Sequence, residues 1–206
     1  MPTAERTAAL EWCVAGRPIP GEERSGDDAL VLAADDGALV AAVDGVGHGP
    51  EAAEAADVAI AAVRDGRSGD VVELAHRCHE ALRPTRGAAL GLAVLRRAGT
   101  LAWLAVGNVS GRLLGGGGVA VSGGQWLPSL SGLPGDELPP LRPATLPLRR
   151  GDVLIVTTDG IDPAYAHEVA ATGTCEEIAD RVLRDHGRVE DDALVVVARY
   201  LGEGPP

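Results

Sequence analysis

The sequence contains no lysine, so all 18 of its basic residues are arginines. This absence excludes every mechanism that needs a lysine side chain, including the phosphate-binding lysine of P-loop enzymes and Schiff-base catalysis. Acidic residues outnumber basic ones and give a formal net charge of -12 at pH 7. Such a charge argues against nucleic acid or an anionic membrane surface as a partner. It suits a site that gathers carboxylates around metal ions.

Cysteines and long apolar runs are also scarce. The three cysteines stand far apart and form no Cys-x-x-Cys pair, which argues against a disulfide framework or a structural zinc site. No apolar stretch reaches the roughly 18 residues of a membrane-spanning helix. The first ten residues carry charges at Glu5 and Arg6 and lack the apolar core of a signal peptide. We therefore expect a cytoplasmic protein with buried, reduced thiols.

The length of 206 residues and the hydrophobic content of 46% are enough for one domain with a substantial core. We expect this single domain to span residues 1–201, followed by a flexible tail at 202–206. Residues 122–149 hold six of the 14 prolines and show little periodicity, which predicts a long Pro/Gly-rich loop. Such a loop is either a functional lid or a solvated excursion of the chain, and the sequence leaves both open.

Apolar runs predict strands at 10–15, 29–33, 38–43, 88–95, 101–106, 111–114, 153–157 and 193–200. Several of these runs are continuously apolar, which is typical of strands covered on both faces. Helices are predicted from Pro50 to about Val63, after Asp70, and from Thr174 to a stop at Gly187. The last two begin with possible capping boxes, because Glu73 and Glu177 follow at the required spacing.

Aspartates recur where the predicted strands begin or end: Asp27 and Asp28, Asp44, Asp159, and the pair Asp191 and Asp192. Each of them alone is explained as well by an ordinary turn. Together they are harder to dismiss, because carboxylates brought together at strand ends would repel one another strongly without cations. Mg²⁺ and Mn²⁺, which prefer oxygen ligands, are the natural partners of such a cluster.

Four segments carry a family resemblance: 25–27 (SGD), 43–49 (VDGVGHG), 150–160 (RGDVLIVTTDG) and 191–197 (DDALVVV). In these segments the chain resembles the PPM (type 2C-like) metal-dependent serine/threonine phosphatases, in their SpoIIE, RsbU and RsbX branch. The likeness extends over essentially the whole chain. A lone catalytic domain without a sensor segment is most similar to the stand-alone RsbX type.

The resemblance implies an α+β fold, a four-layer α-β-β-α sandwich of two mainly antiparallel sheets flanked by helices. It also implies two divalent metal ions, Mn²⁺ or Mg²⁺, in a cleft at one end of the sandwich. Asp44 would bridge both metals and the carbonyl of Gly45 would bind one of them. Asp159 and Asp191 would hold the other metal, and Asp27 would support the second site. Asp28 in place of Asp27, and Asp192 in place of Asp191, remain open, with Asp191 preferred.

The implied reaction is hydrolysis of phosphoserine or phosphothreonine on regulatory proteins of a bacterial stress response or sigma-factor switch. A water bridging the two metals would attack phosphorus, with Asp44, Asp159 and Asp191 acting through that water. His48 would donate a proton to the leaving group if it faces the cleft, and is otherwise a turn residue. Arg24 is a candidate ligand for the substrate phosphate, or else an ordinary surface arginine.

The implied partners are phosphorylated STAS-domain proteins of a stressosome or anti-sigma-antagonist type, bound by a monomeric enzyme. Neither nucleic acid nor a membrane is expected as a partner. Two alternatives remain open on the sequence: a phosphatase of small phosphoesters, and a PPM-like binding module without turnover. The acidic positions argue against the silent module, since nothing would otherwise maintain a mutually repelling cluster.

Overall fold

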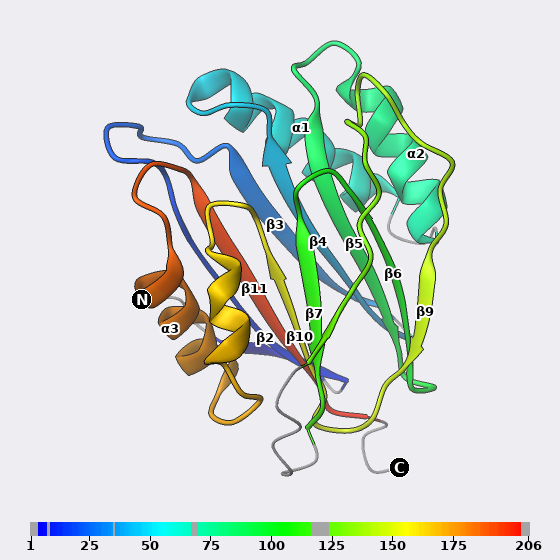
Figure 1. Ribbon diagram of the computed structural model, residues 1–206. Coiled ribbons are helices and arrows are strands. Elements are labelled where there is room, and N and C mark those ends of the chain that lie inside the picture. Colours follow the sequence, from blue (N-terminus) through cyan, green and yellow to red (C-terminus); the bar gives the residue numbers. More distant parts are fainter. Residues whose placement is uncertain (1–3, 8, 35, 67–69, 117–123, 203–206) are drawn as a thin grey trace.

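Two antiparallel sheets lie face to face in the computed structural model (Figure 1), which describes residues 4–7, 9–34, 36–66, 70–116 and 124–202. Sheet A has the strand order β1 (Glu5–Arg6), β2 (Leu10–Arg17), β11 (Ala193–Tyr200), β10 (Val153–Thr157), β7 (Ser110–Leu114) and β8 (Gln125–Trp126). Sheet B has the order β3 (Asp27–Ala34), β4 (Gly37–Gly45), β5 (Ala88–Arg96), β6 (Thr100–Val106) and β9 (Ala144–Pro147). The predicted strands are confirmed to within two residues at each end.

Helices cover the outer face of each sheet. The helices α1 (Pro50–Asp65) and α2 (Val71–Leu82) pack on sheet B, whereas the short 3₁₀ helix η1 (Pro163–His167) and α3 (Cys175–His186) lie on sheet A. The Asp70 carboxylate caps α2 by accepting from two backbone amides, and Thr174 with Glu177 forms the predicted capping box of α3. The four-layer α-β-β-α sandwich is therefore confirmed. No helix in the described part of the chain is long and apolar enough to cross a membrane.

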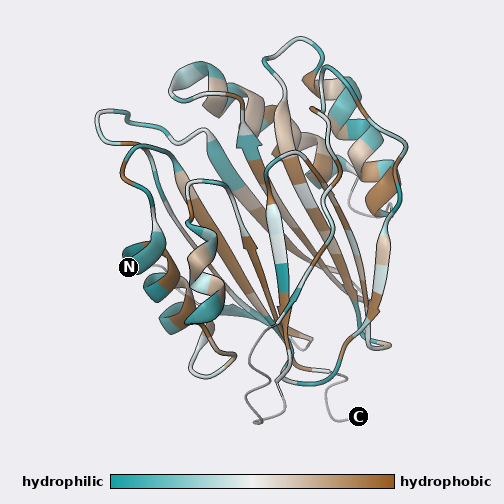
Figure 2. Cartoon of the chain, in the orientation of Figure 1, coloured by the Kyte–Doolittle hydropathy of each residue, from teal (hydrophilic) through white to brown (hydrophobic). Residues whose placement is uncertain are grey.

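The continuously apolar strands are explained by burial on both faces. Along β4, Val40 and Ala42 face the core between the two sheets, while Leu39 and Ala41 face the core beneath α1 and α2. Because successive side chains of a strand point to opposite faces, both faces of β4 must be apolar. Figure 2 shows the resulting hydrophobic colouring along the central strands of both sheets.

The segment 122–149 differs from the predicted loop. The structure describes residues 124–149 of this segment. They contain β8 and the edge strand β9, which pairs with β6. Leu127, Leu146 and Leu148 are buried in the core between the sheets. The sequence pattern did not predict these short strands, because proline interrupts the alternation typical of a strand. Proline is nevertheless tolerated in a strand at the edge of a sheet. This segment is thus part of the fold, and its complete deletion would remove core residues. The predicted tail at 202–206 lies outside the described residues beyond Gly202.

The acidic residues near the strand ends also differ in detail from the prediction. Asp27 and Asp28 are the first two residues of β3, not residues that precede it, and Asp44 is the penultimate residue of β4. They therefore adopt strand geometry, and the pairing of β3 with β4 sets Asp27 directly opposite Asp44. This register fixes which carboxylates share a face of the sheet.

Candidate functional site

The strand register places Asp27 and Asp44 side by side at one end of the sandwich. Paired residues of antiparallel strands point to the same face, and this face also carries Ala42 in the core between the sheets. Asp28 points to the opposite face, toward Asp57 of α1, whose charge helps to raise the pKa of Asp28 beyond the main effect of burial. The alternation of the strand therefore directs Asp27, and not Asp28, toward the space between the sheets.

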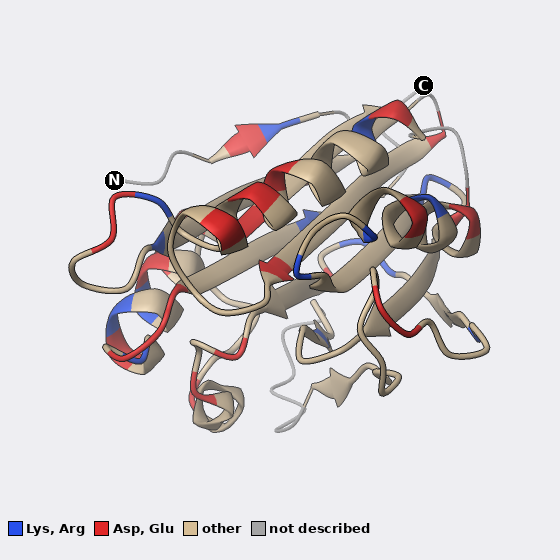
Figure 3. Ribbon diagram, turned by 90° about the horizontal axis from the view of Figure 1, so that it is seen from above, with Lys and Arg blue, Asp and Glu red and all other residues tan. Residues whose placement is uncertain are grey.

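Sheet A contributes two further carboxylates to the same end. Asp159 follows β10 and Asp191 precedes β11, and these two strands are antiparallel neighbours, so the residues meet at one edge. A cleft of about 360 Å³ opens there, lined by Asp44, Val46, Gly47, His48, Ala89, Gly107, Asn108, Gly132, Leu133, Asp159 and Asp191. Figure 3 looks onto this end of the sandwich, where acidic segments lie at strand ends and in the adjoining loops.

The electrostatics of the cleft are those of a carboxylate cluster without a counterion. Burial, followed by the charges of Asp27 and Asp159, raises the pKa of Asp44 to about 8. Burial is also the main cause that raises the pKa of Asp27 to about 7, although a hydrogen bond from Thr158 opposes it. Burial and the charge of Asp159 raise the pKa of Asp191. Among the described residues, no arginine forms an ion pair with any of these four aspartates.

Two residues that the sequence analysis missed hold carboxylates in place. The Thr158 hydroxyl donates to Asp27 Oδ2 at 2.7 Å and accepts from the Leu194 amide at 3.0 Å, which links sheet A to sheet B. The Asn108 amide donates to Asp159 Oδ2 at 2.7 Å. Thr158 stands directly before Asp159 in the sequence, and this adjacency to a predicted site residue could have identified it. Asn108 lies in a loop before β7, and only the fold brings it to the cleft.

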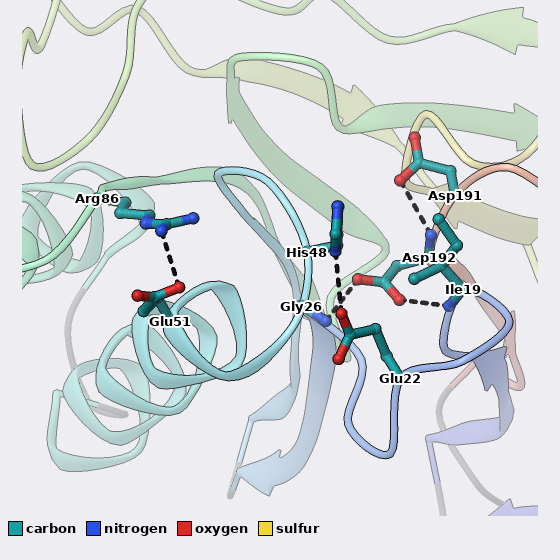
Figure 4. A network of polar contacts seen from close by, with 8 residues as sticks. All are labelled: Ile19, Glu22, Gly26, His48, Glu51, Arg86, Asp191 and Asp192. Atoms are coloured by element: carbon teal, nitrogen blue, oxygen red, sulfur yellow. Dashed lines mark hydrogen bonds and ion pairs between the residues drawn. The ribbon is translucent and has the colours of Figure 1, made fainter.

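Asp191 and Asp192 have different surroundings, as Figure 4 shows. Asp191 lines the cleft. Asp192 is 3% exposed, and its carboxylate accepts from the amides of Ile19 and Gly26, both at 2.7 Å. The Asp192 carboxylate therefore stabilises the loop before β3 through these two hydrogen bonds. Of the two, Asp191 is the one whose carboxylate faces the cleft.

The remaining candidates lie at different places. His48 lines the cleft, and its Nδ1 is 3.2 Å from Glu22 Oε1. Arg24 does not line the cleft, and its guanidinium pairs with Asp57 of α1 at 2.6 Å. Gly45 lies beneath α1, where an added Cβ would stand 2.2 Å from the Ala52 carbonyl oxygen. Glycine is therefore required at this position by the close approach of the helix.

Arg86 is a neighbour of the cleft that the sequence analysis did not identify, although it is not one of the residues that line the cleft. It lies in the loop between α2 and β5, and Arg86 Nη2 donates to Glu51 Oε2 at 2.8 Å. Its other amino group, Nη1, lies 3.3 Å from the position that a Cβ would take at the cleft residue Gly47. An arginine thus borders a cleft whose other charged residues are mainly acidic. No motif marks it, because the neighbouring loops meet only in the fold.

The donor set fits a hard divalent cation. Among the described residues, no group of three or more His, Cys, Asp or Glu side chains is arranged so that it could hold a metal ion, so the fit concerns the chemistry of the donors and not their present arrangement. Asp27, Asp44, Asp159 and Asp191 nevertheless meet without a basic partner among the described residues, and burial, followed by the charges of neighbouring carboxylates, raises the pKa values of Asp44 and Asp27. Oxygen ligands of this kind are those that Mg²⁺ and Mn²⁺ prefer.

These pKa shifts predict that the metal-free protein loses stability as the pH rises. The folded chain keeps protons on Asp27 and Asp44 up to about pH 7 to 8, whereas the ordinary pKa of an aspartate carboxyl is 3.8. Between these limits the folded state binds more protons than the unfolded state, so the free energy of unfolding falls with rising pH. Denaturant titrations in EDTA at pH 5, 6.5 and 8 measure this slope. Asp44→Asn should flatten it, and an unchanged slope in that variant would refute the assignment.

Comparisons with known proteins show the family to which this fold belongs. Residues 34–201 match the family model of Stage II sporulation protein E (SpoIIE). A solved structure described under "The bacterial stressosome: a modular system that has been adapted to control secondary messenger signaling" is 32% identical, with 92% of this chain and 99% of that chain covered and a TM-score of 0.81. No curated protein matches the chain.

Two more distant structures share the fold. RsbX in complex with magnesium is 22% identical over 97% of this chain and 100% of that chain, with a TM-score of 0.86. The catalytic domain of the serine/threonine phosphatase PstP in complex with two manganese ions is 16% identical over 95% and 100%, with a TM-score of 0.72. The family match covers most of the chain, and the sandwich agrees with both structures. The chain therefore belongs to the SpoIIE family, in the SpoIIE/RsbX branch of the PPM phosphatases.

Proposed function

We propose that this chain is a metal-dependent phosphatase that hydrolyses phosphoserine or phosphothreonine on regulatory proteins of a bacterial stress response or sigma-factor switch. The observation that carries the proposal is the meeting of Asp27, Asp44, Asp159 and Asp191 at one end of the sandwich, from both sheets. Membership of the SpoIIE family and the likeness to a stressosome structure support the class of reaction and of partner.

Within this proposal the carboxylates and one carbonyl hold the metals. Asp44 would bind both of two Mn²⁺ or Mg²⁺ ions, the Gly45 carbonyl one of them, Asp159 and Asp191 the other, with Asp27 in support. Such cations, when bound, lower the pKa of an attacking water and offset the charge of the phosphoryl group. Thr158 and Asn108 keep Asp27 and Asp159 oriented through the hydrogen bonds described above. His48, on the cleft wall, would donate the proton to the leaving oxygen.

The substrates would be phosphorylated STAS-domain proteins, met in the cytoplasm by a monomeric enzyme whose single domain spans residues 1–201. The test is release of phosphate from such a phosphoprotein and from a generic aryl phosphate, each with and without Mn²⁺. Manganese-dependent turnover of the phosphoprotein supports the proposal. Turnover of the small ester alone would favour a small-molecule phosphatase, and no turnover of either would favour a silent binding module.

Arg86 is proposed to hold the substrate phosphate at the cleft rim, in the role first considered for Arg24. A phosphomonoester is an anion and meets a cleft of carboxylates, so a guanidinium at the rim would favour its binding. We expect Arg86→Gln to raise KM for an aryl phosphate by about tenfold with little change in kcat. Arg24→Gln is the matched control, because Arg24 pairs with Asp57 away from the cleft. Equal effects of both variants on KM would overturn this role.

A further inference from the structure

A buried arginine on the far face of sheet A has no anionic partner among the residues that the structure describes. Arg112 lies on β7 and is 3% exposed. The strand register pairs it with Ile155, which belongs to the outer core beneath η1 and α3. Arg112 therefore points away from the core between the sheets, and also away from the acidic cleft.

Two of the three guanidinium nitrogens of Arg112 are left without a hydrogen bond. Among the described residues, the buried Nε and Nη1 have no hydrogen-bond partner, and no ion pair includes Arg112. An arginine keeps its charge in proteins, and a buried charge without a partner is strongly unfavourable. Residues 117–123, between β7 and β8, contain no Asp or Glu, so that segment brings no negative charge to it.

Two aromatic residues complete the surroundings of Arg112. The Tyr165 hydroxyl, from η1, is also buried, and it makes no hydrogen bond of regular geometry among the described residues, although the Thr157 side chain lies near enough to oppose part of the rise in its pKa. Trp126 on β8 lies over both side chains, with its ring 5.7 Å from the Arg112 guanidinium carbon and 5.9 Å from the Tyr165 ring. The indole ring offers cation–π attraction but no hydrogen-bond acceptor for the guanidinium. Trp126 is itself 44% exposed, so the side chain that contacts both residues borders solvent.

We propose that Arg112 and Tyr165 form a binding site for a small oxyanion, a phosphate or a carboxylate, beneath Trp126. The guanidinium supplies charge and N–H donors in the planar arrangement that carboxylate and phosphate oxygens accept. The Tyr165 hydroxyl supplies one further donor, since burial raises the pKa of Tyr165 to about 12 and keeps the group protonated. An oxyanion here satisfies two buried polar groups together. The site does not depend on the proposed phosphatase activity.

Tryptophan fluorescence of the full chain tests this site, because Trp126 covers it while Trp12 and Trp103 are buried elsewhere. Inorganic phosphate and acetate are titrated separately at constant ionic strength with EDTA present, which removes metals from the acidic cleft. We expect a saturable change with phosphate, with acetate or with both, accompanied by a higher Tm, because a ligand that binds the folded state stabilises it. A response to phosphate alone identifies a phosphate site, and a response to acetate shows that carboxylates are accepted.

Arg112→Met should abolish the fluorescence change and the rise in Tm with either anion. Tyr165→Phe should weaken binding by several-fold, and it gives an independent readout if Arg112→Met does not fold. The control is Arg96→Met, which removes an exposed arginine paired with Asp36 and should bind like wild type. No saturable change in wild type would overturn the proposal. The same change in Arg112→Met or an unaltered affinity in Tyr165→Phe would also overturn it, and the anion effect would then be an adventitious one.

Discussion

Asp44→Asn should lower the turnover of a phosphorylated substrate by roughly 10³-fold, the size of effect seen when a charge-stabilising group is removed from an active site. Asp44 is the carboxylate proposed to bind both metals, and an asparagine keeps its shape while it removes its charge. The same variant should be more stable than wild type in EDTA at pH 8, on the order of 2 kcal/mol, since burial and neighbouring charges oppose ionisation of Asp44. Loss of turnover together with gain of stability excludes misfolding as the cause.

The control for Asp44→Asn is Asp28→Asn. Asp28 pairs with Val43 on the neighbouring strand, one position from the Asp27–Asp44 pair, and it faces α1 instead of the cleft. Steady-state kinetics with saturating Mn²⁺ should show nearly wild-type turnover in Asp28→Asn. A similar loss in both variants would mean that strand alternation does not divide their roles as described.

Asp191→Ala and Asp192→Ala should have opposite consequences for activity and stability. Asp192 accepts hydrogen bonds from two backbone amides of the loop before β3, so Asp192→Ala leaves both donors without their acceptor. We expect this variant to lose roughly 3 kcal/mol of stability, because hydrogen bonds to a charged group are worth about 1.5–3 kcal/mol each. Asp191→Ala removes a carboxylate from a repelling cluster, so its stability should be retained while its turnover falls.

Chemical denaturation and steady-state kinetics of the two adjacent variants measure this contrast. Asp192→Asn serves as a further control, since the amide oxygen can still accept from the Ile19 or Gly26 amide and should restore part of the stability. The division of roles would be wrong if Asp191→Ala were the less stable variant, or if Asp192→Ala were fully stable.

The sequence predicts the layers of this fold well, because its strands and caps leave local signals. Continuous apolar runs such as Val153–Val156 indicate strands buried on both faces, and Thr174 with Glu177 marks the start of α3. The edge strand β9 leaves no such signal. It is short, ends at Pro147 and has only Leu146 fully within the core, so its assignment depends on pairing with β6.

In the candidate site, too, the residues with a local sequence signal could be predicted, and those placed by tertiary contacts could not. Asp44 and Asp159 are recognisable because each ends an apolar run and precedes a glycine. The choice between Asp27 and Asp28 depends instead on strand register, and the choice between Asp191 and Asp192 on which carboxylate meets the amides of Ile19 and Gly26. Arg86 comes near the cleft residue Gly47 only because two loops distant in the sequence meet there. Such contacts are set by tertiary packing and leave no mark in a single sequence.

Calorimetric titration of Mn²⁺ into the metal-free protein tests the central claim most directly, that carboxylates from both sheets form one metal centre. We expect saturable binding to wild type and to Asp28→Asn. We expect the affinity for Mn²⁺ to be weaker by at least about tenfold in Asp44→Asn, which alters sheet B, and in Asp159→Asn, which alters the end of sheet A. Absence of Mn²⁺ binding by the wild type, or equal affinity in all four proteins, would contradict it.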